Sequence, residues 1–148
     1  MTTTNFQFSF NTLKQPNEIF SQLLDPNSWW VGLFDETIQG QSKTIGDEFT
    51  FSAGGGMHHT TQQLIELVPN KKIAWAVIDS KLTFLKDQNE WDGTTICFEI
   101  EQTNNLTTVT FSHKGLTPEI ECYDQCSSAW TMYLQNLAAK YGEGLANN

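Results

Sequence analysis

The chain has 148 residues, 39% hydrophobic and 12% aromatic, so it is long enough to bury a core without disulfides or metal. Its formal net charge is −9 and it contains no arginine, which excludes the basic surface that nucleic acids and anionic membranes require. No apolar window is long enough for a transmembrane helix. We predict a single domain over residues 1–148.

The N-terminal part predicts one strand and two short helices. Residues 6–11 alternate apolar and polar side chains, as a half-buried strand does. Residues 16–24 begin with proline and place their apolar side chains in one stripe, which indicates a helix. Asp25-Pro26-Asn27 ends that helix. Ser28 is expected to cap a second helical turn carrying Trp29-Trp30.

The middle of the chain predicts strands joined by turns. The expected strands are residues 34–39, 47–53, 57–68, 73–79, 94–102 and 106–114. Gly54-Gly55-Gly56 and Asp92-Gly93 supply turns. Residues 80–91 fit either a short strand or a loop flap over the sheet.

After residue 114 the apolar period changes from two to 3.6, which predicts a long C-terminal helix. Thr117 is the expected N-cap and Pro118 the first helical residue. Gly142 and Gly144 are expected to end the helix. Its apolar stripe is Ile120, Tyr123, Cys126 or Ser127, Trp130, Leu134, Leu137 and Tyr141.

Short connections require antiparallel neighbours, and this helix is the only long apolar stripe available to cover the sheet. We therefore predict an α+β fold, in which a curved antiparallel sheet of about six to seven strands wraps a long C-terminal helix. Two short helices follow the first strand.

Several stretches occur in an order and spacing typical of one family. They are Asp25-Pro26 with Trp29-Trp30, Gly46 to Phe49, Glu66 to Trp75, Glu90-Trp91, Thr107 to His113 with Gly115-Leu116, and Cys122 to Cys126 with Trp130 and Leu137. In these stretches the chain resembles the START-like (SRPBCC) helix-grip superfamily, in the branch of the C-terminal domain of the activator of heat-shock protein 90 ATPase. One departure is Ala129, where this branch often has glycine before the tryptophan.

The resemblance implies the helix-grip fold and a hydrophobic ligand cavity, since members bind lipids, hormones and aromatic polyketides and a few are cyclases. The aromatic excess agrees with such a cavity, although the same side chains can also fill the interior completely. The predicted ligand-binding residues are Trp30, Phe49, Phe51, His59, Trp75, Phe84, Trp91, Phe98, Phe111, His113, Tyr123, Trp130 and Tyr133.

The histidines are the candidate polar groups. Adjacent strand residues face opposite ways, so only one of His58 and His59 points inward, and we expect it to be His59. A zinc site of His59, His113 and Glu90 is an alternative to hydrogen-bonded histidines. His113 shares a face with apolar strand residues, so it is expected to face the cavity, where it orients a ligand or acts as acid–base. The alternative for His113 is a core histidine bonded to the backbone.

No catalytic constellation is evident. The sequence contains no Ser–His–Asp order, phosphate loop or dinucleotide fingerprint, so we assign no catalytic residue, metal or cofactor. Cys122 and Cys126 lie one helical turn apart and are interpreted as small buried residues that let the helix approach the sheet. Glu90 and Asp92 are interpreted as solvated loop charges.

Three functional hypotheses follow. The first is a non-enzymatic binder of a small apolar or aromatic molecule. The second is a polyketide cyclase/aromatase-like or hydrolase-like enzyme that uses His113. The third is a chaperone-associated interaction module, which is less favoured because the named activator has an additional N-terminal domain and this chain starts at its first expected strand. An odd number of cysteines and no signal peptide at Met1 to Asn5 predict a cytoplasmic protein. We expect it to be a monomer or a weak dimer.

Overall fold

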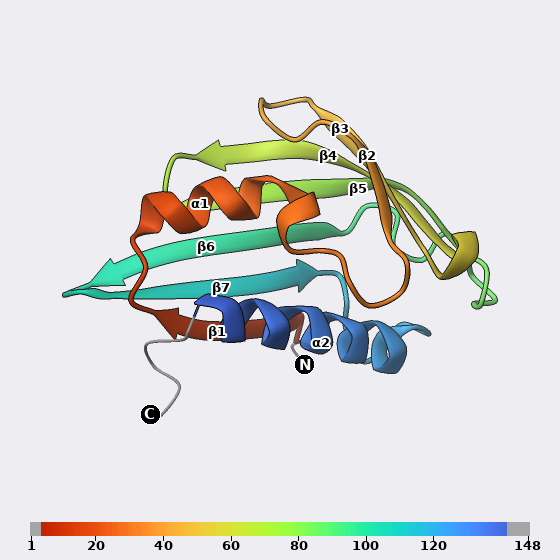
Figure 1. Ribbon diagram of the computed structural model, residues 1–148. Helices are drawn as coiled ribbons and strands as arrows, with labels where there is room; N and C mark the ends of the chain where they lie inside the picture. The colour runs from red at the N-terminus through yellow and green to blue at the C-terminus, as the bar shows by residue number, and fades with distance from the viewer. Residues whose placement is uncertain (1–3, 142–148) are drawn as a thin grey trace.

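The computed structural model describes residues 4–141, which form one antiparallel sheet and two α-helices (Figure 1). The elements in chain order are β1 (Phe6–Thr12), α1 (Pro16–Leu24), the 3-10 turn η1 (Pro26–Ser28), β2 (Thr37–Gly40), β3 (Glu48–Ala53), the 3-10 turn η2 (Gly54–Gly56), β4 (His58–Val68), β5 (Lys72–Leu82), β6 (Thr95–Thr103), β7 (Leu106–Lys114) and α2 (Tyr123–Tyr141). The seven strands of the described chain lie in the order β1-β7-β6-β5-β4-β3-β2.

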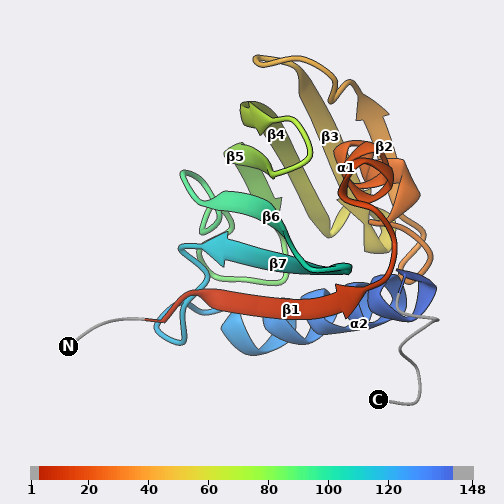
Figure 2. The ribbon, with the colours of Figure 1, turned by 90° about the vertical axis from the view of Figure 1, so that its left-hand side faces the viewer.

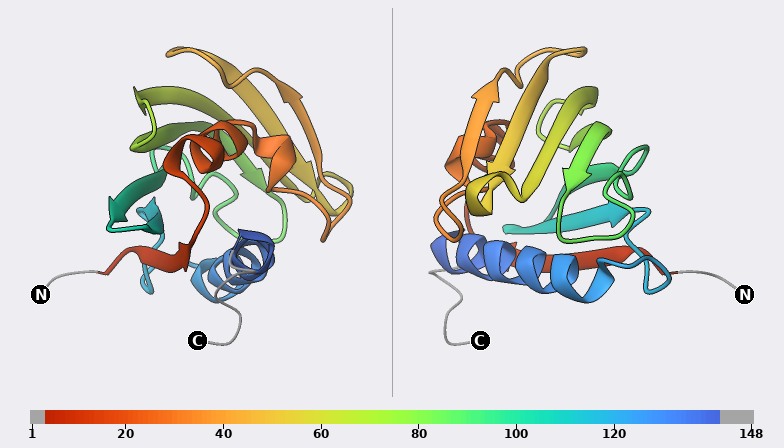
Figure 3. Two further views of the ribbon diagram at one scale, coloured as in Figure 1. Left: turned by 60° about the vertical axis from the view of Figure 1, so that its left-hand side comes forward. Right: turned by 90° about the vertical axis from the view of Figure 1, so that its right-hand side faces the viewer.

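The sheet is strongly curved. Figures 2 and 3 show it sweeping in an arc from β1 to β2, with α1 inside the arc and α2 across its open side. Register shifts in the β4–β5 pair at Thr61/Gln62 and Leu64/Glu66 mark bulges, which bend the strand that contains them. The predicted α+β helix-grip architecture is confirmed, with short helices after the first strand and a long C-terminal helix.

The second short helix lies earlier than predicted. Its cap is Asp25, whose carboxylate accepts a hydrogen bond from the backbone N of Asn27 at 3.1 Å, and not Ser28. Carboxylates and hydroxyls are both good helix caps, so the local sequence did not discriminate between them. Trp29 and Trp30 follow the turn, and both are buried.

The long helix begins at Tyr123, later than the predicted start at Thr117-Pro118. The reason is a contact with the loop between β5 and β6, which local sequence does not reveal. The Glu90 carboxylate accepts hydrogen bonds from the backbone N of Glu121 at 2.7 Å and of Cys122 at 3.0 Å. These bonds satisfy amides ahead of the helix that have no partner within it. The predicted end at Gly142 and Gly144 lies outside the described residues.

Trp29 fills the interior between α1 and the middle strands. Its ring lies 4.9 Å from Phe98, edge to face, and 6.2 Å from Trp75, and its indole N–H donates to the backbone O of Leu23 at 2.9 Å. This large side chain therefore fills the space between α1 and the sheet.

Candidate functional site

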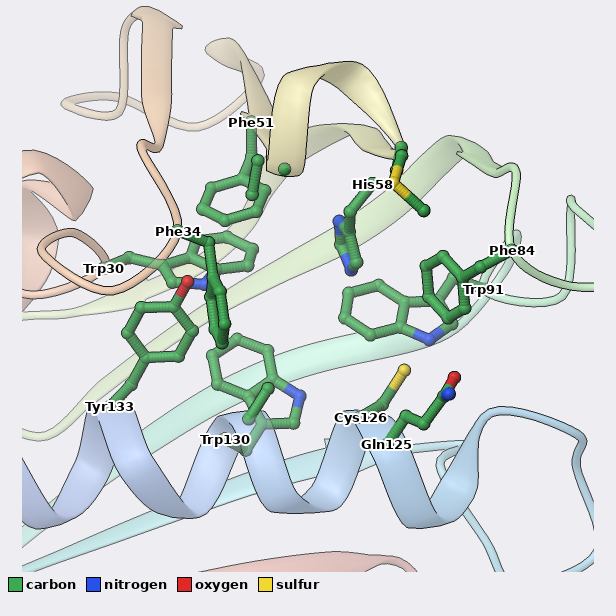
Figure 4. Close-up of a pocket in the computed structure, with 14 residues that line it drawn as sticks. Trp30, Phe34, Phe51, His58, Phe84, Trp91, Gln125, Cys126, Trp130 and Tyr133 are labelled. Atoms are coloured by element: carbon green, nitrogen blue, oxygen red, sulfur yellow. The ribbon is translucent and has the colours of Figure 1, made fainter.

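A cavity of about 330 Å³ lies between the first half of α2 and the η2 turn, where β3 ends and β4 begins. Figure 4 shows its aromatic wall. The lining residues are Trp30, Phe34, Phe51, Ala53, Gly54, Met57, His58, Phe84, Trp91, Gln125, Cys126, Ala129, Trp130 and Tyr133. Aspartate, glutamate, lysine and arginine are absent from this wall, so it suits an uncharged occupant.

The wall is a set of packed rings from four different parts of the chain. The ring of Trp30 stacks on Phe51 with centroids 3.9 Å apart and on Trp130 at 4.9 Å. Trp91, from the loop after β5, stacks with Trp130 at 6.1 Å. Such contacts hold the rings in fixed orientations, so the cavity has defined walls before any ligand arrives.

The structure separates the predicted ligand-binding residues into two groups. Those that line the cavity are Trp30, Phe51, Phe84, Trp91, Trp130 and Tyr133. Those that do not line it are Phe49, His59, Trp75, Phe98, Phe111, His113 and Tyr123. Phe98 and Phe111 lie deeper, 5.1 Å apart in the packed core, and are fully buried. Aromatic content alone does not distinguish a core ring from a lining ring, because both are buried.

The expectation that His59 points inward is wrong, because His58 lines the cavity instead. The buried face of β4 contains His58, Thr60, Gln62 and Leu64. The first three of these residues are polar, so the hydropathy pattern of β4 did not show which of its faces is buried. His59 is on the opposite face, where its Nδ1 lies 3.1 Å from Oγ of Ser52.

The His58 ring stands within a box of aromatic side chains. Its centroid lies 4.7 Å from Trp91 and 5.4 Å from Phe51, both edge to face. Its Nδ1 is buried and has no hydrogen-bond partner in the described chain, while the far edge of the ring points toward α2 (Figure 4). Burial lowers the pKa of His58 from 6.5 to about 4, so the ring is neutral at neutral pH.

His113 lies behind the cavity, contrary to the expectation that it faces it. Its ring is completely buried, 4.5 Å from the Trp91 ring. Nε2 is 2.9 Å from Oγ1 of Thr94, and Nδ1 accepts from the indole N–H of Trp130 at 3.0 Å. Burial lowers the pKa of His113 to about 3. With both nitrogens engaged, this histidine has no free position for an acid–base role on a ligand in the cavity.

The segment between η1 and β2 closes one side of the cavity. The Glu36 carboxylate accepts hydrogen bonds from the backbone N of Gly32 at 2.7 Å and of Phe34 at 2.9 Å, and from the Tyr133 hydroxyl. Burial raises the pKa of Glu36, but the bonds from Tyr133 and the amides outweigh it and lower the pKa overall. The carboxylate therefore ties this segment to α2.

The opposite side of the cavity is formed by the loop between β5 and β6 and the start of α2. Trp91 donates its indole N–H to Sγ of Cys122 at 3.1 Å, and Cys126 lines the wall one turn later. The pKa of the Cys126 thiol is raised by its hydrogen bond with Cys122 and by burial, so it is a poor nucleophile. Cys126 is thus a small residue of the wall, and Cys122 lies buried behind it as the acceptor of the Trp91 indole.

Sequence reasoning missed the residues at the mouth of the cavity. Phe34 and Met57 are 43% and 51% exposed, and Gln125 is also exposed, yet all three line the cavity. A large apolar side chain in a loop or beside a glycine run is a usable signal in the sequence, because apolar side chains at exposed positions mark binding sites. Phe34 was instead expected in a strand, and Met57 at the start of one.

The alternative zinc site of His59, His113 and Glu90 is not formed, since each side chain has a different partner. Within residues 4–141, no group of three or more His, Cys, Asp or Glu side chains is arranged to hold a metal ion. In the same residues, no helix is both long and apolar enough to cross a membrane.

Solved structures with this fold come from several bacteria. The solution structure of the Aha1 dimer from Colwellia psychrerythraea superposes with a TM-score of 0.71 at 22% identity, covering 93% of this chain and 96% of that one. The AHSA1 protein from Silicibacter pomeroyi gives 0.68 at 15% identity, covering 93% and 96%. A protein from Nitrosospira multiformis gives 0.69 at 13% identity, covering 97% and 100%. At these identities the likeness establishes the fold alone.

A search among curated proteins found no match. The sequence model of the family described as activator of Hsp90 ATPase homolog 1-like protein matches residues 14–142, which is most of the chain. The matched stretch runs from just before α1 to the end of α2 and so includes every lining residue of the cavity. The chain therefore belongs to the activator of Hsp90 ATPase homolog 1-like family, a branch of the START-like helix-grip superfamily.

Proposed function

We propose that this protein binds a small apolar or aromatic molecule in the cavity beneath α2 and that it has no catalytic role of its own. The observation that supports this is the cavity of about 330 Å³, whose wall consists of stacked aromatic rings and contains no Asp, Glu, Lys or Arg side chain. An apolar cavity of roughly 150 Å³ holds one benzene ring, so this one has room for a ligand of about two fused rings. Burial of such a ligand supplies the affinity.

We propose no catalytic role because of the state of two histidines, the fully buried His113 and the half-buried His58. His113 has both ring nitrogens engaged in the core, and His58 is neutral with no carboxylate partner to activate it. General acid–base catalysis needs a group whose pKa lies near the working pH, and both pKa values lie well below it.

Direct binding tests this proposal. Trp30, Trp91 and Trp130 line the cavity, so their fluorescence reports on an occupant in a panel of two-ring aromatics and short lipids. A ligand at a hundred times its Kd should also stabilise the fold by about 2.7 kcal/mol, measured by thermal unfolding. Absence of binding across the panel contradicts the proposal.

A variant that fills the cavity gives the matched control. Ala129→Phe places a ring in the wall and should weaken binding of any panel ligand at least about tenfold, since each lost ring contact is costly. Ser128→Phe, on the adjacent exposed position, should leave binding unchanged. Equal affinities in the two variants would place the ligand elsewhere on the protein.

A chaperone-associated role is the second candidate, and it rests on membership of the family matched over residues 14–142. Recovery of stoichiometric heat-shock protein 90 in a pull-down supports it. The Ala129→Phe variant separates the two candidates, because filling the cavity should weaken ligand binding and leave a surface interaction intact.

The proposal includes a cytoplasmic location and a monomeric or weakly dimeric state. Cys97, Cys122 and Cys126 are free and buried, which agrees with a reducing compartment. Fractionation of cells tests the location, and light scattering over a range of concentrations tests the oligomeric state.

A further inference from the structure

The polar groups in the cavity wall are not equivalent. The indole N–H of Trp91 is engaged by Cys122, that of Trp130 by His113, and the Tyr133 hydroxyl by Glu36. These three groups therefore have little left to offer a ligand. Gln125 is exposed at the mouth, where water competes for its amide.

His58 is different because its ring is held in the wall without a protein partner for its buried Nδ1. The rings of Trp91 and Phe51 pack edge to face against it and fix its orientation. Its far edge points into the space between α2 and the sheet (Figure 4). A neutral imidazole has one donor and one acceptor nitrogen, so Nε2, at the far edge of the ring, can donate to or accept from a ligand in the cavity.

We infer that His58 selects the ligand, and that the ligand is an uncharged aromatic molecule whose hydroxyl group hydrogen-bonds Nε2 of His58. This inference rests on the proposed function and narrows its ligand class. A hydroxyl fits either tautomer of the ring, because it both donates and accepts. A carboxylate does not fit, because the wall offers it no counter-charge and the buried imidazole stays neutral.

The test uses three probes of one shape: naphthalene, 2-naphthol and 2-naphthoate. Their dissociation constants for the wild-type protein are measured by equilibrium dialysis at neutral pH. The expected order is 2-naphthol tighter than naphthalene by about fivefold, from one net hydrogen bond, with 2-naphthoate weakest.

Matched variants test whether the preference for 2-naphthol over naphthalene comes from the His58 ring. His58→Phe should bring the ratio of the naphthalene and 2-naphthol constants to about one, while His58→Gln keeps a polar group and retains part of the preference. His59→Phe, at the adjacent position on the outer face of β4, should keep the wild-type ratio. A loss of the preference in His59→Phe, or its persistence in His58→Phe, overturns the inference.

The wild-type protein alone also decides the matter if a variant does not fold. The ring nitrogen chemical shifts of His58 should move on addition of 2-naphthol and stay in place with naphthalene, with those of His113 as an internal reference. Binding of naphthalene and 2-naphthol with equal affinity overturns the role of His58 but leaves the proposed function standing. Tight binding of 2-naphthoate overturns the uncharged ligand class, and failure of all three probes counts against the cavity as a binding site.

Discussion

The indole N–H of Trp130 donates a hydrogen bond of 3.0 Å to Nδ1 of His113 and so joins α2 to β7 behind the cavity. Because tryptophan can only donate, Nδ1 must be the acceptor and the proton resides on Nε2. Nε2 then donates to Oγ1 of Thr94, whose own hydroxyl donates to the backbone O of Trp91 at 2.7 Å. This buried chain fixes the tautomer of His113 and positions two of the cavity's indoles.

Replacing His113 should destabilise the fold. His113→Leu leaves the Trp130 N–H without a partner and opens a void, so unfolding in urea should show a loss of about 2–4 kcal/mol. His59→Leu, on the outer face, should stay within about 0.5 kcal/mol of the wild type. A double-mutant cycle of His113→Leu with Trp130→Phe should reveal a coupling energy, and additive losses would show that the bond contributes nothing.

Gly115 is required at the end of β7 because of its neighbour Thr94. Its φ is +103°, and a Cβ there would lie 2.6 Å from Cγ2 of Thr94. Gly115→Ala should therefore cost about 1–3 kcal/mol in urea unfolding and weaken the His113–Thr94 bond. Gly93→Ala shares a positive φ, +84°, but meets no atom within 4 Å, so it measures the backbone strain alone. Equal losses in the two variants would show that the contact with Thr94 is unimportant.

Stability should fall in mild acid because of the buried histidines. Burial lowers the pKa of His58 from 6.5 to about 4 and that of His113 to about 3, so below pH 6.5 the unfolded chain binds protons that the folded chain refuses. The free energy of unfolding is therefore highest above pH 6.5, the pKa of histidine in the unfolded chain. It falls as the pH drops from 6.5 toward the lower pKa values of the folded protein.

The His58 contribution is measurable by difference. Between pH 6.5 and about pH 5, the free energy of unfolding of His58→Phe should fall by about 1–2 kcal/mol less than that of the wild type. Urea unfolding at each pH measures this difference. This pH range lies above the pKa values of most carboxylates, so their protonation contributes little to the difference. Parallel pH profiles for the two proteins would contradict the buried, neutral state of His58.

The bond between Tyr133 and Glu36 should hold the segment from Gly32 to Phe34 against α2. Tyr133→Phe removes that bond, and exchange of the amide hydrogens of this segment should accelerate about tenfold, as expected for a lost bond to a charged acceptor. Bound probes should also dissociate faster. Tyr123→Phe, on the same helix but outside the cavity lining, is the control. Unchanged exchange in Tyr133→Phe would show that the backbone bonds to Glu36 suffice.

The elements of the fold were predictable from sequence because their signals are local. Alternation marked β3, β6 and β7, and the change of period after residue 114 marked α2. The start of α2 was not predictable, because the partner of its preceding amides is Glu90, about thirty residues away in sequence. A helix end that is satisfied from another part of the chain leaves no local signature.

By itself, the sequence determined most of the strands and the long helix, the antiparallel pairing of consecutive strands from β2 to β7 and the large stock of aromatic side chains. The first two depend on short-range patterns along the chain, and the third is composition alone. Only the tertiary structure decided which rings fill the core and which line a cavity. That depended on Trp29 packing between α1 and the middle strands and on the polar face of β4 placing His58 inside. The physical reason is that core packing and pocket lining need the same apolar side chains, and only long-range packing determines where a space is left between them.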